Sequence, residues 1–219
     1  MILCFKGRMC ITRTKVLAVC VAAIIISLAL IVVFSGAGAT RVACLGDSIT
    51  QFSTYPDELQ TLLGTSYNVK EFGVSGSTVL INSFTPYLDQ REFQKAKEFL
   101  PDIVIILLGT NDARADYYQS IDNFVADYEQ LVRDVQALES KPKIFLVTPP
   151  PLFENNLHLS NANLLEGVIP SIKQVAEDLG LTIIDVYTPL SGHPEYFPDG
   201  VHPNNDGAKI IASEIYKAI

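Results

Sequence analysis

Short apolar runs alternate with amphipathic helical periods along residues 41–219. The run at 103–108, Ile-Val-Ile-Ile-Leu-Leu, is apolar at every position, as expected of a strand buried on both faces of a parallel sheet. The expected strands are 41–45, 68–72, 103–108, 143–147 and 182–186. The expected helices are 56–63, 88–99, 121–138, 164–179 and 206–218. This alternation predicts an α/β fold in which helices cover both faces of the sheet.

The clearest helical signal lies at 121–138. Its apolar residues recur at the i, i+3, i+4, i+7 spacing that places them on one core-facing side: Ile121, Phe124, Val125, Tyr128, Leu131, Val132, Val135 and Leu138. In contrast, residues 149–163 have no regular period after the fourth expected strand. Loops of this length often border a functional site.

The longest apolar run precedes this pattern, at residues 16–34. It contains 19 residues without a charge and would span roughly 28 Å as a helix. Lys6, Arg8, Arg13 and Lys15 precede it, which predicts a transmembrane anchor with the following domain on the extracytoplasmic side. The sequence 37–39, Ala-Gly-Ala, leaves a cleaved signal peptide and a secreted domain as the alternative, and a buried core helix as a weaker one. The expected organisation is a basic segment, an anchor and a short linker at 1–40, followed by one folded domain at 41–219.

The charge of that domain excludes one class of partner. Four of the 16 Lys and Arg residues precede the domain, so residues 41–219 carry 12 of them against all 24 Asp and Glu residues. Such an acidic domain repels polyanions, and nucleic acid is therefore not an expected partner. Cys44 is the only cysteine in the domain, so no disulfide can form within it. Cys44 is expected to be a small apolar residue of a buried strand, with a reactive thiol as the alternative.

Polar, glycine-containing turns follow the first three expected strands. They read Gly46-Asp47-Ser48, Gly73-Val74-Ser75-Gly76 and Gly109-Thr110-Asn111-Asp112. The carboxyl ends of parallel strands share one edge of a sheet, where α/β proteins build their sites. A fourth polar block, Asp199-Gly200-Val201-His202-Pro203-Asn204, precedes the last expected helix. These blocks together supply a serine, a histidine and an acid.

Nucleophilic catalysis needs these three residue types together. A serine hydroxyl attacks an ester only when an imidazole takes its proton, and an acceptor must keep that imidazole in one tautomer. Ser48, His202 and Asp199 can fill these three positions. The oxyanion that forms needs preorganised donors, which the backbone N–H groups of Ser48 and Gly76 and the side-chain amide of Asn111 could supply.

The combination of Gly-Asp-Ser, Gly-Thr-Asn-Asp and a late Asp-x-x-His-Pro resembles the GDSL, or SGNH, family of serine esterases and acylhydrolases. The resemblance covers essentially all of residues 41–219. It implies a three-layer α/β/α sandwich whose five-stranded parallel sheet has the order 2-1-3-4-5. It also implies Ser48 as nucleophile, Gly76 and Asn111 as oxyanion donors, and Asp199 and His202 as acid and base. The chain departs from the family at the turn after the second expected strand. Family members often have Asn before this turn, whereas this chain reads Glu71-Phe72-Gly73.

The expected function is that of a membrane-anchored, extracytoplasmic serine esterase that works through an acyl-enzyme. Residues 55–56, 148–151 and 196–204 resemble the branch with carbohydrate O-acetylesterases and acetylhydrolases, so the expected substrate is a small-molecule or glycan O-acetyl ester. A lysophospholipase or thioesterase is the enzymatic alternative, and a catalytically silent, membrane-tethered binding module is the alternative of another class. The sequence does not predict the oligomeric state.

Several other polar residues have simpler interpretations. No cofactor or metal is expected, because no helical His pair or Cys cluster provides a ligand spacing; a metal site at Asp185, His193, Asp199 and His202 is the weak alternative. His158 and His193 are expected in exposed loops, and Asp47 and Asp112 are expected to brace their own turns. Tyr117 and Tyr118 could pack against the protein or line a substrate pocket.

Overall fold

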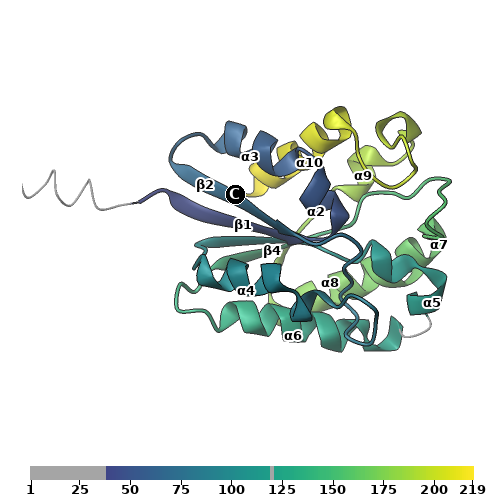
Figure 1. The fold of residues 1–219 in the computed structure, drawn as a ribbon, viewed down its shortest axis with the longest axis horizontal. Coiled ribbons are helices and arrows are strands. Elements are labelled where there is room, and N and C mark those ends of the chain that lie inside the picture. The colour runs from purple at the N-terminus through teal and green to yellow at the C-terminus, as the bar shows by residue number, and fades with distance from the viewer. Residues whose placement is uncertain (1–37, 119–120) are drawn as a thin grey trace, which may run out of the picture. The chain divides into compact units, whose positions relative to one another are not determined.

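A computed structural model describes residues 38–118 and 121–219 of the protein. Residues Thr40–Ile219 form one compact unit with a parallel sheet between two helical layers (Figure 1). The strands are β1 (Thr40–Gly46), β2 (Tyr67–Gly73), β3 (Ile103–Leu107), β4 (Lys143–Val147) and β5 (Thr182–Ile184). Their order is β2-β1-β3-β4-β5, and every neighbouring pair is parallel. The predicted three-layer fold and strand order are confirmed.

Helices of different parts of the chain form the two outer layers. One layer contains α3 (Tyr55–Leu63) and α10 (Asn205–Ala218), and the other contains α4 (Arg91–Glu98), α6 (Phe124–Gln136) and α8 (Ile169–Leu179) (Figure 1). The short helices are α2 (Ser48–Phe52), α5 (Ala115–Tyr118), α7 (Asn161–Asn163) and α9 (Tyr187–Leu190). Single 3-10 turns occur at Tyr87–Asp89, Asn111–Ala113, Ile121–Asn123 and Pro194–Tyr196, and a π-helical turn occurs at Leu164–Val168.

The central strand β3 separates two hydrophobic clusters. All five of its residues are buried, and their side chains alternate between the sheet faces. Val104 and Ile106 belong to the cluster beneath α4, α6 and α8, whereas Ile103, Ile105 and Leu107 belong to the one beneath α3 and α10. Burial on both faces explains why this strand is apolar throughout.

The predicted helix 88–99 is wrong in its first part. A 3-10 turn covers Tyr87–Asp89, Gln90 is extended, and the helix proper begins at Arg91. Tyr87 is completely buried and its hydroxyl donates to the carbonyl of Phe72 in β2. This contact with a distant strand fixes the turn ahead of α4, and local periodicity does not reveal it.

Four other predicted elements differ at their ends. The strand β5 stops at Ile184 rather than at residue 186, because the Asp185 carboxylate accepts the Thr188 N–H at 3.0 Å and starts α9. The strand β3 stops at Leu107, one residue before its predicted end. The predicted helices 121–138 and 164–179 begin with the 3-10 turn and the π-helical turn, respectively.

The predicted anchor at residues 16–34 lies outside the described residues. Among residues 38–118 and 121–219, none of the helices has the length and apolar character that crossing a membrane requires.

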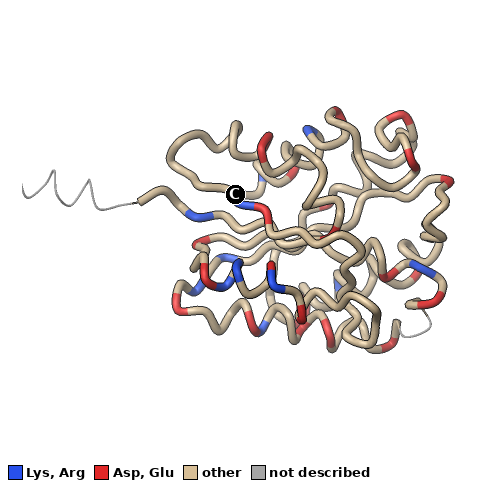
Figure 2. The backbone as a smooth tube through the Cα atoms, in the orientation of Figure 1, with Lys and Arg blue, Asp and Glu red and all other residues tan. Residues whose placement is uncertain are grey.

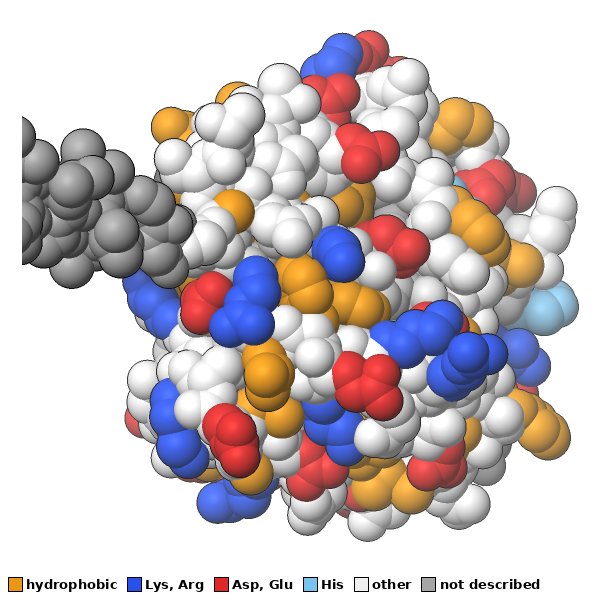
Figure 3. Space-filling view, turned by 60° about the vertical axis from the view of Figure 1, so that its left-hand side comes forward, with side chains coloured by type: hydrophobic (Ala, Val, Ile, Leu, Met, Phe, Trp, Pro, Cys, Tyr) orange, Lys and Arg blue, Asp and Glu red, His pale blue; other side chains and the backbone are white. Residues whose placement is uncertain are grey.

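Charged residues are distributed over the whole domain. Acidic positions occur in both helical layers (Figure 2). On the face in Figure 3, basic and acidic side chains are interspersed with apolar ones. Ion pairs such as Arg41 with Asp102 and Lys95 with Glu92 join opposite charges in the domain.

Candidate active site

Ser48 lies at the carboxyl end of β1, where the chain turns directly into α2. Asp47 caps this helix, and its Oδ1 accepts the Ile49 N–H at 2.9 Å. Asp47 is completely buried and Ser48 is only 8% exposed. The packed, hydrogen-bonded turn therefore fixes the position of Ser48.

Ser48, His202 and Asp199 form a continuous chain of hydrogen bonds. The Nε2 atom of His202 lies 2.8 Å from Ser48 Oγ, and its Nδ1 lies 2.6 Å from Asp199 Oδ2. The other carboxylate oxygen of Asp199 accepts the N–H groups of Val201 at 3.0 Å and His202 at 2.7 Å. The fold thus brings together residues that are 154 positions apart in the chain.

The charge of Asp199 suits this arrangement. Partial burial disfavours its charged form, but the hydrogen bonds from the His202 ring and from the His202 and Val201 backbone lower the pKa of Asp199 overall. A carboxylate at this position keeps a proton on Nδ1 and leaves the Nε2 lone pair facing Ser48 Oγ. This arrangement can remove the serine proton during attack on an ester carbonyl.

The turn that contains Gly76 is bonded to the turn that contains Ser48. The Val74 N–H donates to the Gly46 carbonyl at 3.0 Å, and the Ser75 N–H donates to Gln51 Oε1 at 2.8 Å. Gly76 has a φ of 77°, a conformation that side chains disfavour. Within the described residues, the N–H groups of Gly76 and Ser48 donate to no protein acceptor. They are therefore available to an oxyanion.

Asn111 opens the 3-10 turn that follows β3. Its Nδ2 donates to the Ser77 carbonyl at 2.9 Å and lies 3.4 Å from Asp47 Oδ2. The amide is thus joined to the turns of both Gly76 and Ser48. All five residues that the sequence indicated, Ser48, Gly76, Asn111, Asp199 and His202, belong to one connected site.

Asp112 braces a different segment from the one expected. Its carboxylate accepts the N–H groups of Val79 at 3.0 Å and Leu80 at 2.9 Å, in the loop after β2. Burial raises the pKa of Asp112 to about 7, and burial raises that of Asp47 to about 6. Asp47 caps its own turn as predicted, but its contact with Asn111 was not predicted, because it joins turns 64 residues apart.

The remaining candidates lie outside the hydrogen-bonded chain. Cys44 is completely buried in β1, as predicted for a small apolar residue of a buried strand, and burial raises the pKa of its thiol to about 12. His158 is exposed, and His193 lies 2.8 Å from Glu195. Tyr117 packs against the core beneath α6 and against Phe84, with ring centroids 6.2 Å apart. Among the described residues, no His, Cys, Asp and Glu side chains form a group that could hold a metal ion.

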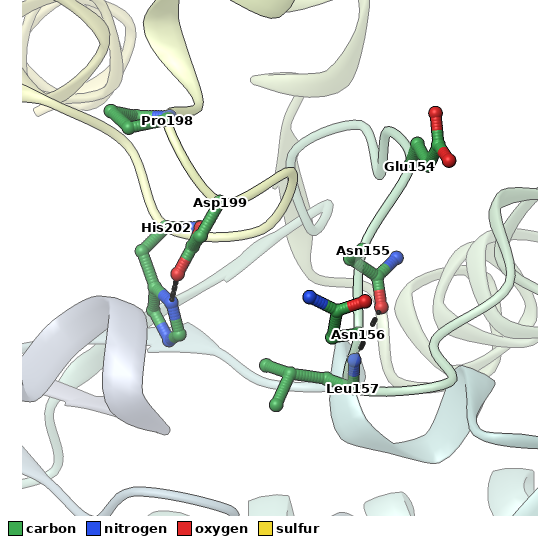
Figure 4. A pocket seen from close by; sticks show the side chains of 7 residues that line it. All are labelled: Glu154, Asn155, Asn156, Leu157, Pro198, Asp199 and His202. Atoms are coloured by element: carbon green, nitrogen blue, oxygen red, sulfur yellow. Dashed lines mark hydrogen bonds and ion pairs between the residues drawn. The ribbon is translucent and has the colours of Figure 1, made fainter.

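Sequence reasoning missed one part of the site. A cavity of about 630 Å³ lies against His202 and Asp199, and residues 154–157 and Pro198 form the rest of its lining (Figure 4). The only signal in the sequence was the length of the irregular stretch 149–163.

Solved structures of low sequence identity share the fold. An acetyl xylan esterase aligns with a TM-score of 0.67 and 22% identity over 82% of this chain and 99% of its own. A putative arylesterase from Agrobacterium tumefaciens aligns with a TM-score of 0.68 and 22% identity over 82% of this chain and 97% of its own.

The relationship by sequence is closer. An acetylxylan esterase from Xylanibacter ruminicola is 36% identical in a match that covers 83% of this chain but only 43% of that protein. This chain therefore spans less than half the length of that relative. The model of the GDSL-like lipase/acylhydrolase family matches residues 44–210, a region that holds every residue of the site described above. By this match, the chain belongs to the GDSL-like lipase/acylhydrolase family, a family of carboxylic ester hydrolases.

Proposed function

We propose that the protein is a serine esterase that removes O-acetyl groups from carbohydrate through an acyl-enzyme intermediate. The observation that carries the proposal is the hydrogen-bonded chain from Ser48 through His202 to Asp199, with distances of 2.8 and 2.6 Å. A catalytically silent binding module has no need of a serine in contact with an oriented imidazole.

The proposed reaction has two steps. Ser48 Oγ attacks the ester carbonyl and gives its proton to His202 Nε2, while the N–H groups of Ser48 and Gly76 and the Asn111 amide stabilise the oxyanion. The carbon–oxygen bond to the alcohol then breaks, and His202 protonates the departing oxygen. Water attacks the acetylated serine by the reverse path and releases acetate.

Two kinds of support favour an acetylated carbohydrate as substrate. The relative with 36% identity is an acetylxylan esterase, and one structural neighbour is an acetyl xylan esterase. The cavity beside His202 is also lined by the exposed amide of Asn156, which suits a hydroxyl-rich ligand better than an acyl chain.

A fluorophosphonate probe and a substrate panel test the proposal. The probe should label the wild-type protein, and Ser48→Ala should lose the label and several orders of magnitude in turnover. Acetylated xylose should be hydrolysed faster than lysophospholipid or long-chain thioesters. Labelling of the Ser48→Ala variant at the wild-type rate would refute the mechanism, and a kinetic preference for lysophospholipid would refute the substrate class.

We further propose that residues 16–34 anchor the domain outside the cytoplasm. The support is the uncharged run of 19 residues preceded by four cations. Full-length protein should remain with membranes after alkaline extraction, and the domain should be accessible to protease added outside intact cells. Release of the protein into the medium without residues 1–39 would indicate signal cleavage instead.

A further inference from the structure

The cavity beside His202 lies between two loops of the carboxyl edge. The loop after β4 contributes residues 154–157, and the loop before α10 contributes Pro198, Asp199 and His202 (Figure 4). Its volume of about 630 Å³ is in the ordinary range of ligand sites. The residues that line it include the histidine and the acid of the site but not Ser48.

The proposed chemistry places the alcohol part of an ester beside His202, which lines this cavity. His202 must protonate the departing oxygen, so that oxygen has to come within hydrogen-bond reach of Nε2. The carbonyl oxygen has to face the N–H groups of Ser48 and Gly76 instead. An acetyl group has only two carbons, so a cavity of this size exceeds what the acyl part needs.

The two walls of the cavity are joined to each other. The Phe153 N–H donates to the Gly200 carbonyl at 2.8 Å, and the rings of Phe153 and Phe197 are 5.2 Å apart. A Cβ atom on Gly200, whose φ is +80°, would lie 2.1 Å from the Glu154 carbonyl oxygen. Only glycine therefore permits this approach, and the cavity is a built feature of the loop pair.

Asn155 shapes the wall and has no free hydrogen-bonding capacity. Its Nδ2 donates to the carbonyls of Phe153 at 2.8 Å and Leu159 at 3.0 Å, and its Oδ1 accepts the N–H groups of Leu157 at 3.0 Å and Leu159 at 3.2 Å. The amide is therefore saturated.

Asn156 and Leu157 follow Asn155 in the chain and also line the cavity. Asn156 is exposed and lines the cavity. Leu157 is 48% exposed, and Figure 4 shows its side chain between Asn155 and His202. An amide beside an apolar surface matches a sugar ring, which combines hydroxyl groups with apolar C–H faces.

We infer that this cavity binds the alcohol portion of the ester and takes a polyhydroxylated alcohol such as a sugar unit. Asn156 hydrogen-bonds its hydroxyl groups, and Leu157 packs against its C–H face. The inference rests on the proposed esterase function and adds the subsite that selects the alcohol.

Two acetate esters test the inference. Acetylated xylose has a hydroxylated alcohol part, whereas phenyl acetate has an alcohol part without additional hydroxyls. Asn156→Ala should lower kcat/KM for acetylated xylose about 3- to 10-fold, mainly through KM, and leave phenyl acetate within about 2-fold, because one uncharged hydrogen bond is lost. Free xylose should inhibit phenyl acetate hydrolysis competitively, and Asn156→Ala should weaken that inhibition.

Leu157→Ala should lower kcat/KM for acetylated xylose, because the C–H face of the sugar loses the surface it packs against. Matched controls are Asn68→Ala in β2 and Leu62→Ala in α3, which are exposed positions outside the cavity lining. Neither control should change kcat/KM for either ester. Equal losses on both esters, or an unchanged sugar ester, would overturn the subsite while the esterase function stands. Turnover of neither ester by the wild-type protein would overturn the proposed function and the subsite with it.

Discussion

At the residue scale, Asp47 connects the nucleophile turn to the oxyanion site. One carboxylate oxygen of Asp47 caps α2 by accepting the Ile49 N–H, and the other lies 3.4 Å from the Asn111 amide nitrogen. A single buried side chain thus positions two groups that the proposed reaction uses at the same time. The Ser77 carbonyl accepts one Nδ2 hydrogen of Asn111 at 2.9 Å, which orients the amide before substrate arrives, and the other hydrogen turns to the oxyanion when its longer contact with Asp47 breaks.

This arrangement predicts the effect of Asn111→Ala. The variant should lose on the order of 10²–10³ in kcat on phenyl acetate, as removal of one oxyanion donor typically does. The matched control is Asn82→Ala, an exposed position that should leave kcat unchanged. Thermal melting of both variants checks that the fold persists. A folded Asn111→Ala variant with wild-type kcat would show that Asn111 is not an oxyanion donor.

At the scale of elements, acidic side chains fasten the long loop after β2 to the sheet edge. Asp112 accepts the N–H groups of Val79 and Leu80, and Asp127 of α6 accepts the Ile81 N–H at 2.9 Å. The turn after β3 and the helix α6 therefore both hold the loop that follows Gly76. The position of the proposed oxyanion site depends on these contacts.

The raised pKa of Asp112 predicts a pH-dependent stability. Its value of about 7 lies above the ordinary 3.8, so its contribution to the free energy of unfolding is full below about pH 4 and is lost as the pH rises through about 7. The destabilisation by Asp112→Asn should therefore be greater at pH 4.5 than at pH 7.5, by up to about 3 kcal/mol. Urea denaturation at the two pH values measures it. An equal loss of unfolding free energy at both pH values would mean that burial does not raise the pKa of Asp112.

At the scale of the whole molecule, residues Thr40–Ile219 contain both hydrophobic clusters and every residue of the proposed site. A unit with its own core on both sheet faces can fold alone. A chain that starts at Thr40 should therefore unfold cooperatively and hydrolyse phenyl acetate with a kcat/KM within about 2-fold of full-length protein. Calorimetry and steady-state kinetics test this. A folded fragment without activity would mean that residues 1–39 contribute to the site.

The sequence by itself determined the order of elements and the residues of the hydrogen-bonded site. Apolar periodicity is a local property, so it located the five strands and the main helices, and the Gly-Asp-Ser, Gly-Thr-Asn and Asp-x-x-His blocks stand at strand or helix ends that follow from it. The sheet order came from the resemblance of these blocks to a known family, and the structure confirms it.

Tertiary structure alone decided which loops meet and what they hold. The break at Gln90 depends on Tyr87 reaching Phe72, the role of Asp112 depends on a loop 32 or 33 residues earlier, and the cavity depends on Gly200 lying against Glu154. Each of these contacts joins positions that have no periodic relation along the chain. Their geometry arises only when the packed sheet brings its loops to one edge, which is why the substrate side of the site could not be read from residue spacing.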